Sequence, residues 1–264
     1  MKTMVNILII LATIYLLICA VLFYYQDKLI FFPMQSQDDL YDSVSQNEIS
    51  FSHGKELRHG WNVKVNESES KTVIYFGGNA QDVVYLNFEA ESFKIHQLIA
   101  VNHPGYGKST GTPSQISLYD AALQAYDWSI EQYKLNPDDI IVMGRSLGSS
   151  VATYLAANRE IKGLVLITPF DSIENIAASQ YKYFPVKYLM KHAFPTVDYI
   201  SQVQVPTLML AAENDEIIAH ENLQKLKQNA NGNNRLIQYP NVGHNSIQEH
   251  KNYYPDINRF LDSL

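Results

Sequence analysis

The chain has 264 residues, of which 46% are hydrophobic, and a formal net charge of −7. This length accommodates one large α/β domain with a sizeable core and a short appendage. The acidic balance, with no block of basic residues, argues against nucleic acid as a partner. The single cysteine, Cys19, lies in an apolar run, which excludes an internal disulfide and a cysteine-based metal site.

An apolar run opens the chain. No charged residue lies between Lys2 and Asp27, and residues 5–25 are almost wholly apolar. At about 1.5 Å of rise per residue, such a helix can cross a hydrocarbon core of roughly 30 Å. The aromatic residues 23–25, with Lys28 just beyond them, are typical of an anchor at a membrane surface.

A cleaved signal peptide is the alternative to an anchor. The small residue nearest the end of the run is Ala20, and the bulky Ile18 two positions before it makes a poor cleavage site. The sequence therefore predicts an uncleaved single-pass anchor over residues 1–28, a connector over 29–46 and one folded domain over 47–264. The charges at the two ends of the anchor differ little, and we expect the domain outside the cytoplasm.

The pattern of the folded domain changes along the chain. Residues 47–65 contain two extended runs separated by His53-Gly54-Lys55, which predicts an antiparallel hairpin. From Lys71 onward strands and helices alternate. Such alternation is typical of an α/β fold whose mostly parallel central sheet has helices on both faces.

The individual elements follow from apolar runs and turn residues. Strands are expected at 73–76, 98–101, 140–143, 163–168, 207–211 and 235–239. Helices are expected at 81–96, 113–133, 220–230 and 249–264, the second of them capped by Thr112. Residues 172–205 have no strong period, and we expect them to form a small lid over a fairly open cleft.

One turn carries a chemical motif. The apolar strand 140–143 runs into Gly144-Arg145-Ser146-Leu147-Gly148, and an Ala-rich helical segment follows. A Gly-x-Ser-x-Gly turn between a strand and a helix is the context of a nucleophile elbow. The turn would hold Ser146 in a strained conformation at the edge of the sheet, and the glycines would avoid collisions. Ser146 is therefore the predicted nucleophile.

A serine nucleophile needs a base, and on this kind of sheet the expected order is serine, acid, histidine. Of the four histidines after Ser146, His244 lies in a turn straight after the last strand, where its ring can reach over the sheet edge. The others are His192 in the lid, His220 at a helix start and His250 in the closing helix. We interpret these three as surface or capping residues, which leaves His244 as the predicted base.

Two aspartates follow strands and could orient the base. Asp215 lies one helix and one strand before His244, whereas Asp171 follows the preceding strand. We favour Asp215 as the acid and expect Asp171 to cap the first turn of the lid or to order its loop. The neighbouring Glu213 and Glu216 are interpreted as parts of a solvated turn.

An oxyanion hole needs two backbone N–H groups. One is expected from Leu147, which follows the nucleophile at the start of a helix. The other is expected from Asn79, because Gly77 and Gly78 before it allow the backbone to approach closely.

A phosphate loop and a metal site are both excluded. Residues 102–109 end in Gly-Lys-Ser, but Asn102 stands where that motif needs its first glycine, and Pro104 lacks a donor N–H. No spacing of histidines and carboxylates is typical of a metal site, so no metal and no cofactor are expected.

Several segments together resemble the alpha/beta-hydrolase superfamily. They are Gly77-Gly78-Asn79-Ala80, Pro104-Gly105-Tyr106-Gly107-Lys108-Ser109, Gly144-Arg145-Ser146-Leu147-Gly148, Pro169-Phe170-Asp171-Ser172, Asp215 and Gly243-His244. From about residue 51 to 264 the chain is most similar to single-pass, membrane-anchored hydrolases related to acyl-protein thioesterases, lysophospholipases and serine aminopeptidases. It departs from them at 77–78, where the family usually has His-Gly, and at 102–105, where it often has Asp-x-Arg-Gly.

The resemblance implies the alpha/beta-hydrolase fold and a set of roles. By motif, Ser146 is the nucleophile, Asp215 the acid and His244 the base, and Asn79 and Leu147 are the oxyanion donors. Neither departure from the family pattern touches these three catalytic positions.

The sequence thus predicts a membrane-tethered serine hydrolase that cleaves an ester or thioester of a small-molecule, lipid or acylated substrate through an acyl-enzyme. Two alternatives stay open. A peptidase of the same fold would need a charge, such as Glu213 or Glu216, to hold a peptide amino terminus. A non-catalytic scaffold would keep the fold but has no use for three chemically matched positions.

Overall fold

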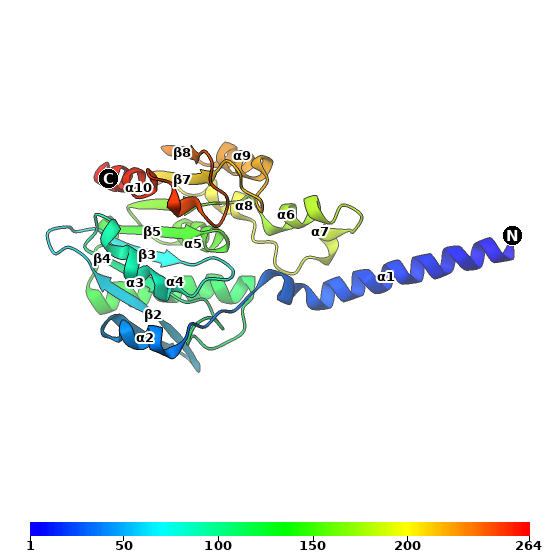
Figure 1. Ribbon diagram of the computed structural model, residues 1–264, viewed down its shortest axis with the longest axis horizontal. Helices are drawn as coiled ribbons and strands as arrows, with labels where there is room; N and C mark the ends of the chain where they lie inside the picture. The colour runs from blue at the N-terminus through cyan, green and yellow to red at the C-terminus, as the bar shows by residue number, and fades with distance from the viewer.

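An eight-stranded sheet forms the centre of the computed structural model, which describes residues 1–264 (Figure 1). Its spatial order is β1-β2-β4-β3-β5-β6-β7-β8. The strands are β1 (Glu48–His53), β2 (Glu56–Lys64), β3 (Thr72–Phe76), β4 (Gln97–Val101), β5 (Ile140–Arg145), β6 (Gly163–Ile167), β7 (Thr207–Ala212) and β8 (Asn234–Tyr239). Strand β2 is antiparallel to β1 and β4, and all other neighbours are parallel.

Helices cover both faces of the sheet. One face packs against α4 (Gln115–Tyr133), α5 (Leu147–Asn158), α8 (Thr196–Ile200) and α9 (His220–Asn229), and the other against α2 (Asp38–Ser43), α3 (Leu86–Glu89) and α10 (Tyr253–Asp262). Strand β3 supplies both cores, because Val73 and Tyr75 face one side while Ile74 and Phe76 face the other. The predicted fold class, with its hairpin and two-sided cover, is confirmed.

Three helices differ from their predicted bounds. Residues 81–96 form only α3 between two short 3-10 turns. Val84 and Leu86 are both buried, and a regular helix would point them about 200° apart. Helix α4 begins at Gln115, and its cap is Ser114, whose Oγ accepts from the Ser117 N–H at 3.0 Å, so the prediction of Thr112 was wrong. The closing helix is shorter than expected and begins at Tyr253.

The lid is smaller than the sequence suggested. We define it as residues 172–195, which include α6 (Ile173–Gln180) and α7 (Val186–Leu189). The remainder of the segment expected to form it turns back into the domain, where α8 packs against α5 and α9. Ile200 and Val203 are buried in the core there.

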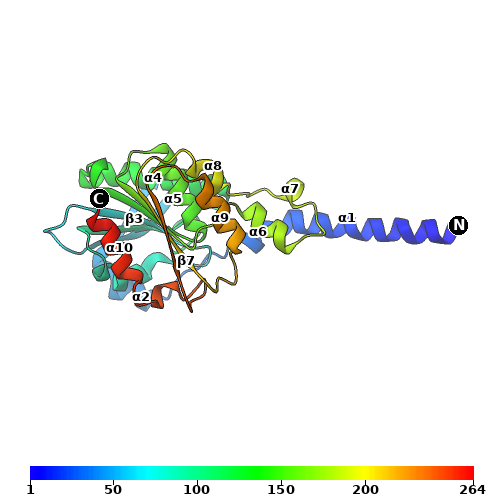
Figure 2. The same ribbon diagram turned by 90° about the horizontal axis from the view of Figure 1, so that it is seen from above.

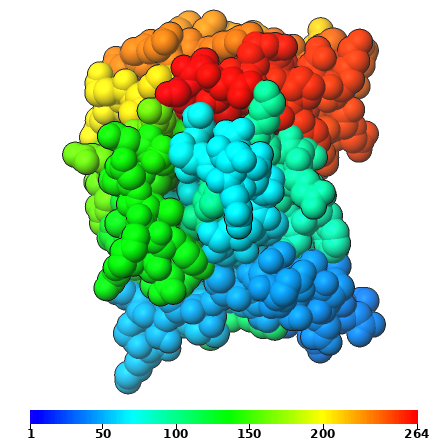
Figure 3. Space-filling view, turned by 90° about the vertical axis from the view of Figure 1, so that its left-hand side faces the viewer, coloured from blue at the N-terminus to red at the C-terminus, as the bar shows by residue number.

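Helix α1 (Lys2–Ile30) projects from the domain and is long and apolar enough to cross a membrane (Figures 1 and 2). Nearly all of it is exposed, and its second half, from Tyr15 onward, contacts the lid of the domain. The opposite end of the domain, seen in Figure 3, brings together α10 in red, the chain around residue 70 in cyan and the end of α4 in green. The carboxyl ends of the parallel strands therefore lie on the side of α1.

Candidate active site

The turn after β5 has the geometry of a strained elbow. Ser146 has φ 51° and ψ −118°, in a region that residues other than glycine rarely occupy. A Cβ on Gly144 would lie 2.1 Å from the Gly148 carbonyl oxygen, and one on Gly148 would lie 2.1 Å from that of Phe76. Both positions therefore need glycine, because strand and helix meet too closely for any side chain.

The structure brings together the three side chains predicted to carry the chemistry. His244 Nε2 lies 2.9 Å from Ser146 Oγ, and its Nδ1 lies 3.0 and 2.9 Å from the two carboxylate oxygens of Asp215. Because an ionised carboxylate only accepts, Nδ1–H donates to Asp215 and Nε2 is free to accept from the serine hydroxyl. The ring is 3% exposed, so water does not compete for it.

Asp215 is itself fixed by its backbone surroundings. Its Oδ1 accepts from the N–H groups of Ile217 at 3.0 Å and Ile218 at 2.7 Å. Asp171, the other candidate, is buried and does not reach the histidine. Its oxygens accept from the Ser172 N–H at 2.8 Å and from Asn222 Nδ2 at 2.7 Å, which ties the lid to α9.

Two charged residues hold the loop that carries the histidine. Glu216 Oε2 accepts from the His244 N–H at 2.9 Å, and Gly243 leaves room for it, since a Cβ there would lie 2.7 Å from the same oxygen. Arg145 donates to the carbonyls of His244 at 3.4 Å and Asn245 at 3.3 Å. Glu216 is exposed, in agreement with its interpretation as part of a solvated turn, and it also fixes the loop that carries His244. Its position next to Asp215 was the only signal in the sequence, and Arg145 offered none.

The loop after β3 supplies a free backbone donor. The Gly78 N–H donates to Gln81 Oε1 at 3.0 Å, whereas the Asn79 N–H makes no hydrogen bond within the chain. Leu147 is the first residue of α5, where backbone N–H groups lack an acceptor within the helix. These are the two positions that the sequence predicts as oxyanion donors.

A buried histidine forms a hydrogen bond to the backbone of this loop. His103 Nε2 lies 2.8 Å from the Gly77 carbonyl oxygen, and burial lowers the pKa of the His103 ring to about 4. The ring is therefore neutral near pH 7 and donates to that carbonyl. His103 lies in the segment where the chain departs from the usual family pattern.

Comparisons with known proteins identify this fold. A family model described as alpha/beta hydrolase fold matches residues 71–195, and one described as PhoPQ-activated pathogenicity-related protein matches 174–264. An uncharacterized protein of Mycobacterium tuberculosis is 28% identical over 229 residues, covering 83% of this chain and 80% of that one. The alpha/beta hydrolase domain-containing protein aho-3 of Caenorhabditis elegans is 26% identical over 196 residues, covering 72% and 57%.

A solved structure of a Pyrococcus furiosus esterase superposes with a TM-score of 0.67 at 16% identity, covering 89% of this chain and 97% of the esterase. The chain has the alpha/beta-hydrolase fold.

A pocket opens beside Ser146. It has a volume of about 250 Å³, and fifteen of its nineteen lining residues are hydrophobic. None of the nineteen is charged: they are Leu22, Gln26, Leu29, Ile30, Asn79, Ser146, Leu147, Phe170, Ile173, Ile176, Ala177, Gln180, Tyr181, Phe184, Val186, Leu189, Met190, Ile217 and Ile218.

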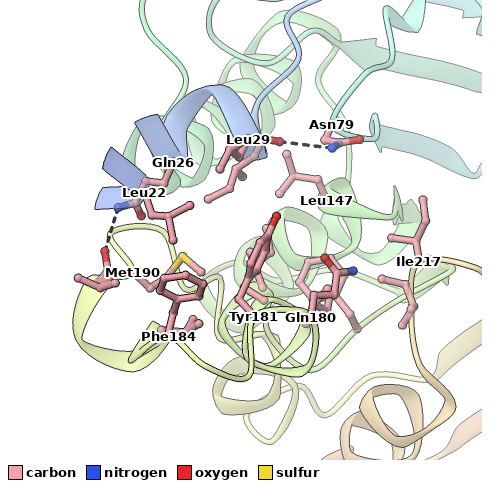
Figure 4. Close-up of a pocket in the computed structure, with 18 of the residues that line it drawn as sticks. Leu22, Gln26, Leu29, Asn79, Leu147, Gln180, Tyr181, Phe184, Met190 and Ile217 are labelled. Carbon is pink, nitrogen blue, oxygen red and sulfur yellow. Dashed lines mark hydrogen bonds between the residues drawn. The ribbon is translucent and has the colours of Figure 1, made fainter. Parts of the chain in front are cut away.

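Three parts of the protein wall this pocket: the edge of the sheet that carries Ser146, the lid and residues 22–30 of α1 (Figure 4). In Figure 4, Asn79, Leu147 and Ile217 stand at one end, while Leu22 and Gln26 face Phe184 and Met190 at the other. On this side, α1 forms one wall of the cleft that the sequence predicts to be fairly open. Nothing in the sequence pattern indicates that α1 lines the pocket.

Proposed function

We propose that this alpha/beta hydrolase is a membrane-anchored serine hydrolase that cleaves carboxylic esters or thioesters through an acyl-enzyme. The observation that carries the proposal is the continuous hydrogen-bonded path from Asp215 through His244 to Ser146, at a strained elbow. A serine hydroxyl is a weak nucleophile until a base takes its proton, and this path supplies that base.

The proposed reaction has two halves, acylation and deacylation, and Ser146, His244 and Asp215 take part in both. Ser146 Oγ attacks the acyl carbon while His244 Nε2 takes the hydroxyl proton, and Asp215 stabilises the resulting imidazolium. The N–H groups of Leu147 and Asn79 bind the oxyanion. As the bond to the leaving alcohol or thiol breaks, His244 returns the proton to it.

Water completes the cycle by the same route. His244 takes a proton from a water molecule, whose oxygen attacks the acyl carbon. The tetrahedral intermediate then collapses, breaking the bond to Ser146 Oγ, which recovers its proton from His244. The products are a carboxylic acid and the free enzyme.

The lining of the pocket favours an acyl substrate over a peptide. An aminopeptidase-like enzyme needs a carboxylate near the nucleophile to hold a protonated amino terminus, yet none of the nineteen lining residues is charged. Glu216, the nearest candidate in sequence, accepts from the His244 N–H instead. The apolar walls fit a hydrocarbon chain, and the length and hydropathy of α1 support a membrane anchor.

A substrate panel tests this proposal. Full-length protein in detergent micelles would be given a butyryl oxygen ester, a butyryl thioester and an aminoacyl amide of the same chromophore. We expect turnover of the first two and none of the third, with Ser146→Ala abolishing all turnover. Preferred cleavage of the amide would support the peptidase, and no turnover of any substrate would contradict the proposed hydrolase.

A further inference from the structure

The last turns of α1 are fixed to the oxyanion loop. Asn79 Nδ2 donates to the Ile30 carbonyl at 3.3 Å, and the Asn79 carbonyl accepts from the Phe32 N–H at 3.0 Å. Tyr106 donates its hydroxyl to the same Asn79 carbonyl at 2.7 Å. The end of the anchor is therefore bonded directly to a residue of the catalytic machinery.

The same helix is also fixed to the lid. Gln26, a buried polar residue near the end of the helix, donates through Nε2 to the Leu189 carbonyl at 2.8 Å. Its Oε1 accepts from the Lys191 N–H at 2.7 Å. A polar side chain in an apolar helix is costly unless its partners are fixed, so these two bonds set how α1 docks.

The tip of the lid reaches back along the membrane-spanning part of α1. Tyr15 donates its hydroxyl to the Tyr183 carbonyl at 2.8 Å, and its ring stacks on Phe184 with centroids 5.7 Å apart. Tyr15 lies ten residues before Tyr25, which is about 15 Å along a helix. The lid therefore packs along the second half of α1, beside the segment predicted to enter the bilayer.

The outer surface of the lid has the composition of a membrane interface. Tyr183 and Tyr188 are 88% and 85% exposed, unusual values for large aromatic side chains, and Lys182 and Lys187 stand beside them. Tyrosine and lysine together are typical of protein surfaces at the level of lipid headgroups. Lipid would cover these side chains if the domain rests on the bilayer.

From these contacts we propose that α1 and the lid form an acyl-chain subsite that opens toward the bilayer. The substrate class is an ester or thioester whose long acyl chain is embedded in the same membrane as the anchor. This inference rests on the proposed hydrolase function and adds to it the source of the substrate and the residues that select its length.

The subsite has a length that can be tested. Leu22 and Ile30, both in the lining, are eight residues apart, which is about 12 Å along the helix. Asn79, which bonds to the Ile30 carbonyl, and Leu147 lie near the Leu29 end, and Met190 lies near the Leu22 end (Figure 4). A short acyl group would occupy only the end near Ser146, whereas a long chain would extend to Leu22.

Narrowing the Leu22 end of the subsite tests which acyl chains extend that far. Full-length protein in phosphatidylcholine nanodiscs would be assayed with an acetyl and a dodecanoyl ester of the same phenol. We expect Leu22→Trp to lower kcat/KM for the dodecanoyl ester by about tenfold or more and to leave the acetyl ester within about twofold of wild type. The matched control is Leu17→Trp, at an exposed position of α1 outside the pocket, which should change neither.

A second variant keeps the test decisive if Leu22→Trp does not fold. Met190→Trp narrows the same end from the lid and should give the same selective loss. If both variants change kcat/KM for the two esters by the same factor relative to wild type, the proposed subsite is contradicted. If the wild type hydrolyses neither ester, the proposed function fails instead, so the two failures are distinguishable.

The membrane source of the substrate has its own test. A long-chain lipid ester that does not exchange between vesicles would be placed either in the same phosphatidylcholine vesicles as the protein or in separate ones. We expect hydrolysis to be at least about tenfold faster when substrate and protein share a bilayer than when they are in separate vesicles. The reason is that the pocket can open only to the bilayer that holds the protein. Equal rates in the two arrangements would overturn access from the bilayer.

Discussion

The two sides of the pocket are held together differently. The catalytic side is fixed by the adjacent parallel strands β5 to β8 and by the carboxylates of Asp215 and Glu216, which accept from backbone N–H groups. The opposite side, formed by α1 and the lid, rests on a few side-chain bonds centred on Gln26 and Asn79. Damage to the first side should slow every substrate, whereas damage to the second should change only which substrates are preferred.

The largest expected effect comes from removing the charge of the acid. Asp215→Asn should lower kcat by about 10³–10⁴-fold for short and long esters alike, because His244 then loses the partner that fixes its tautomer. Steady-state kinetics with both esters would measure it.

Asp171→Asn is the matched control for that change. Asp171 lies after the neighbouring strand and binds the lid and α9, so its variant should keep the rate on acetyl ester close to wild type. Equal losses in the two variants would show that Asp215 has no special role.

The next effect is on the pH dependence of the free energy of unfolding, and it tests how firmly the catalytic side is held. Burial lowers the pKa of His103 to about 4 from an ordinary value of about 6.5. Above pH 6.5 the ring is neutral whether folded or not. Between pH 6.5 and 4 the unfolded chain binds a proton that the folded chain excludes. The free energy of unfolding therefore falls as the pH is lowered, by up to about 1.4 kcal/mol per pH unit.

Replacing that histidine should remove its share of the pH dependence. The free energy of unfolding of His103→Gln, measured in denaturant between pH 7 and 5, should fall less steeply than that of the wild type. A slope unchanged by the substitution would mean that His103 is not the group responsible.

A smaller effect is expected from the loop that carries the base. Glu216→Ala removes the acceptor of the His244 N–H and should lower kcat by about tenfold or more, since a hydrogen bond to a charged group contributes about 1.5–3 kcal/mol. Glu216→Gln keeps an oxygen at that place and should recover most of the rate. KM should change little for either variant, and a loss confined to KM would argue against positioning of the base.

The smallest effect should come from loosening α1. Gln26→Leu keeps the bulk of the side chain but removes both bonds to the lid, and about 1 kcal/mol of lost docking corresponds to about a fivefold lower kcat/KM on the dodecanoyl ester. The acetyl ester should be unaffected. A loss shared by both esters would mean that α1 supports the catalytic side as well.

The catalytic side was largely predictable from sequence, and the reasons are local. Ser146 lies in a strand-turn-helix motif whose glycines are required by contacts within a few residues, and His244 directly follows a strand. The order of parallel strands then brings their carboxyl ends together, so the sequence alone predicts that Asp215 approaches His244.

The α1 side was not predictable, because it depends on contacts between distant segments. Gln26 bonds to residues more than 160 positions away, and a lone glutamine in an apolar run carries no sign of its partner. The prediction of one helix over residues 81–96 was wrong for a related reason, because burial of this segment against the sheet outweighed its tendency to form a regular helix. Glu216 was missed because its partner is a backbone N–H, which no sequence motif marks.

Labelling with a fluorophosphonate probe tests the central claim most directly, because the probe reacts with an activated serine and leaves a covalent adduct. The wild type should take up one label, on the peptide that contains Ser146, and Ser146→Ala should take up none. Ser150→Ala, in the same helix and bonded to Tyr119, should label like the wild type. Absence of label from the wild type, or equal labelling of Ser146→Ala, would contradict the account.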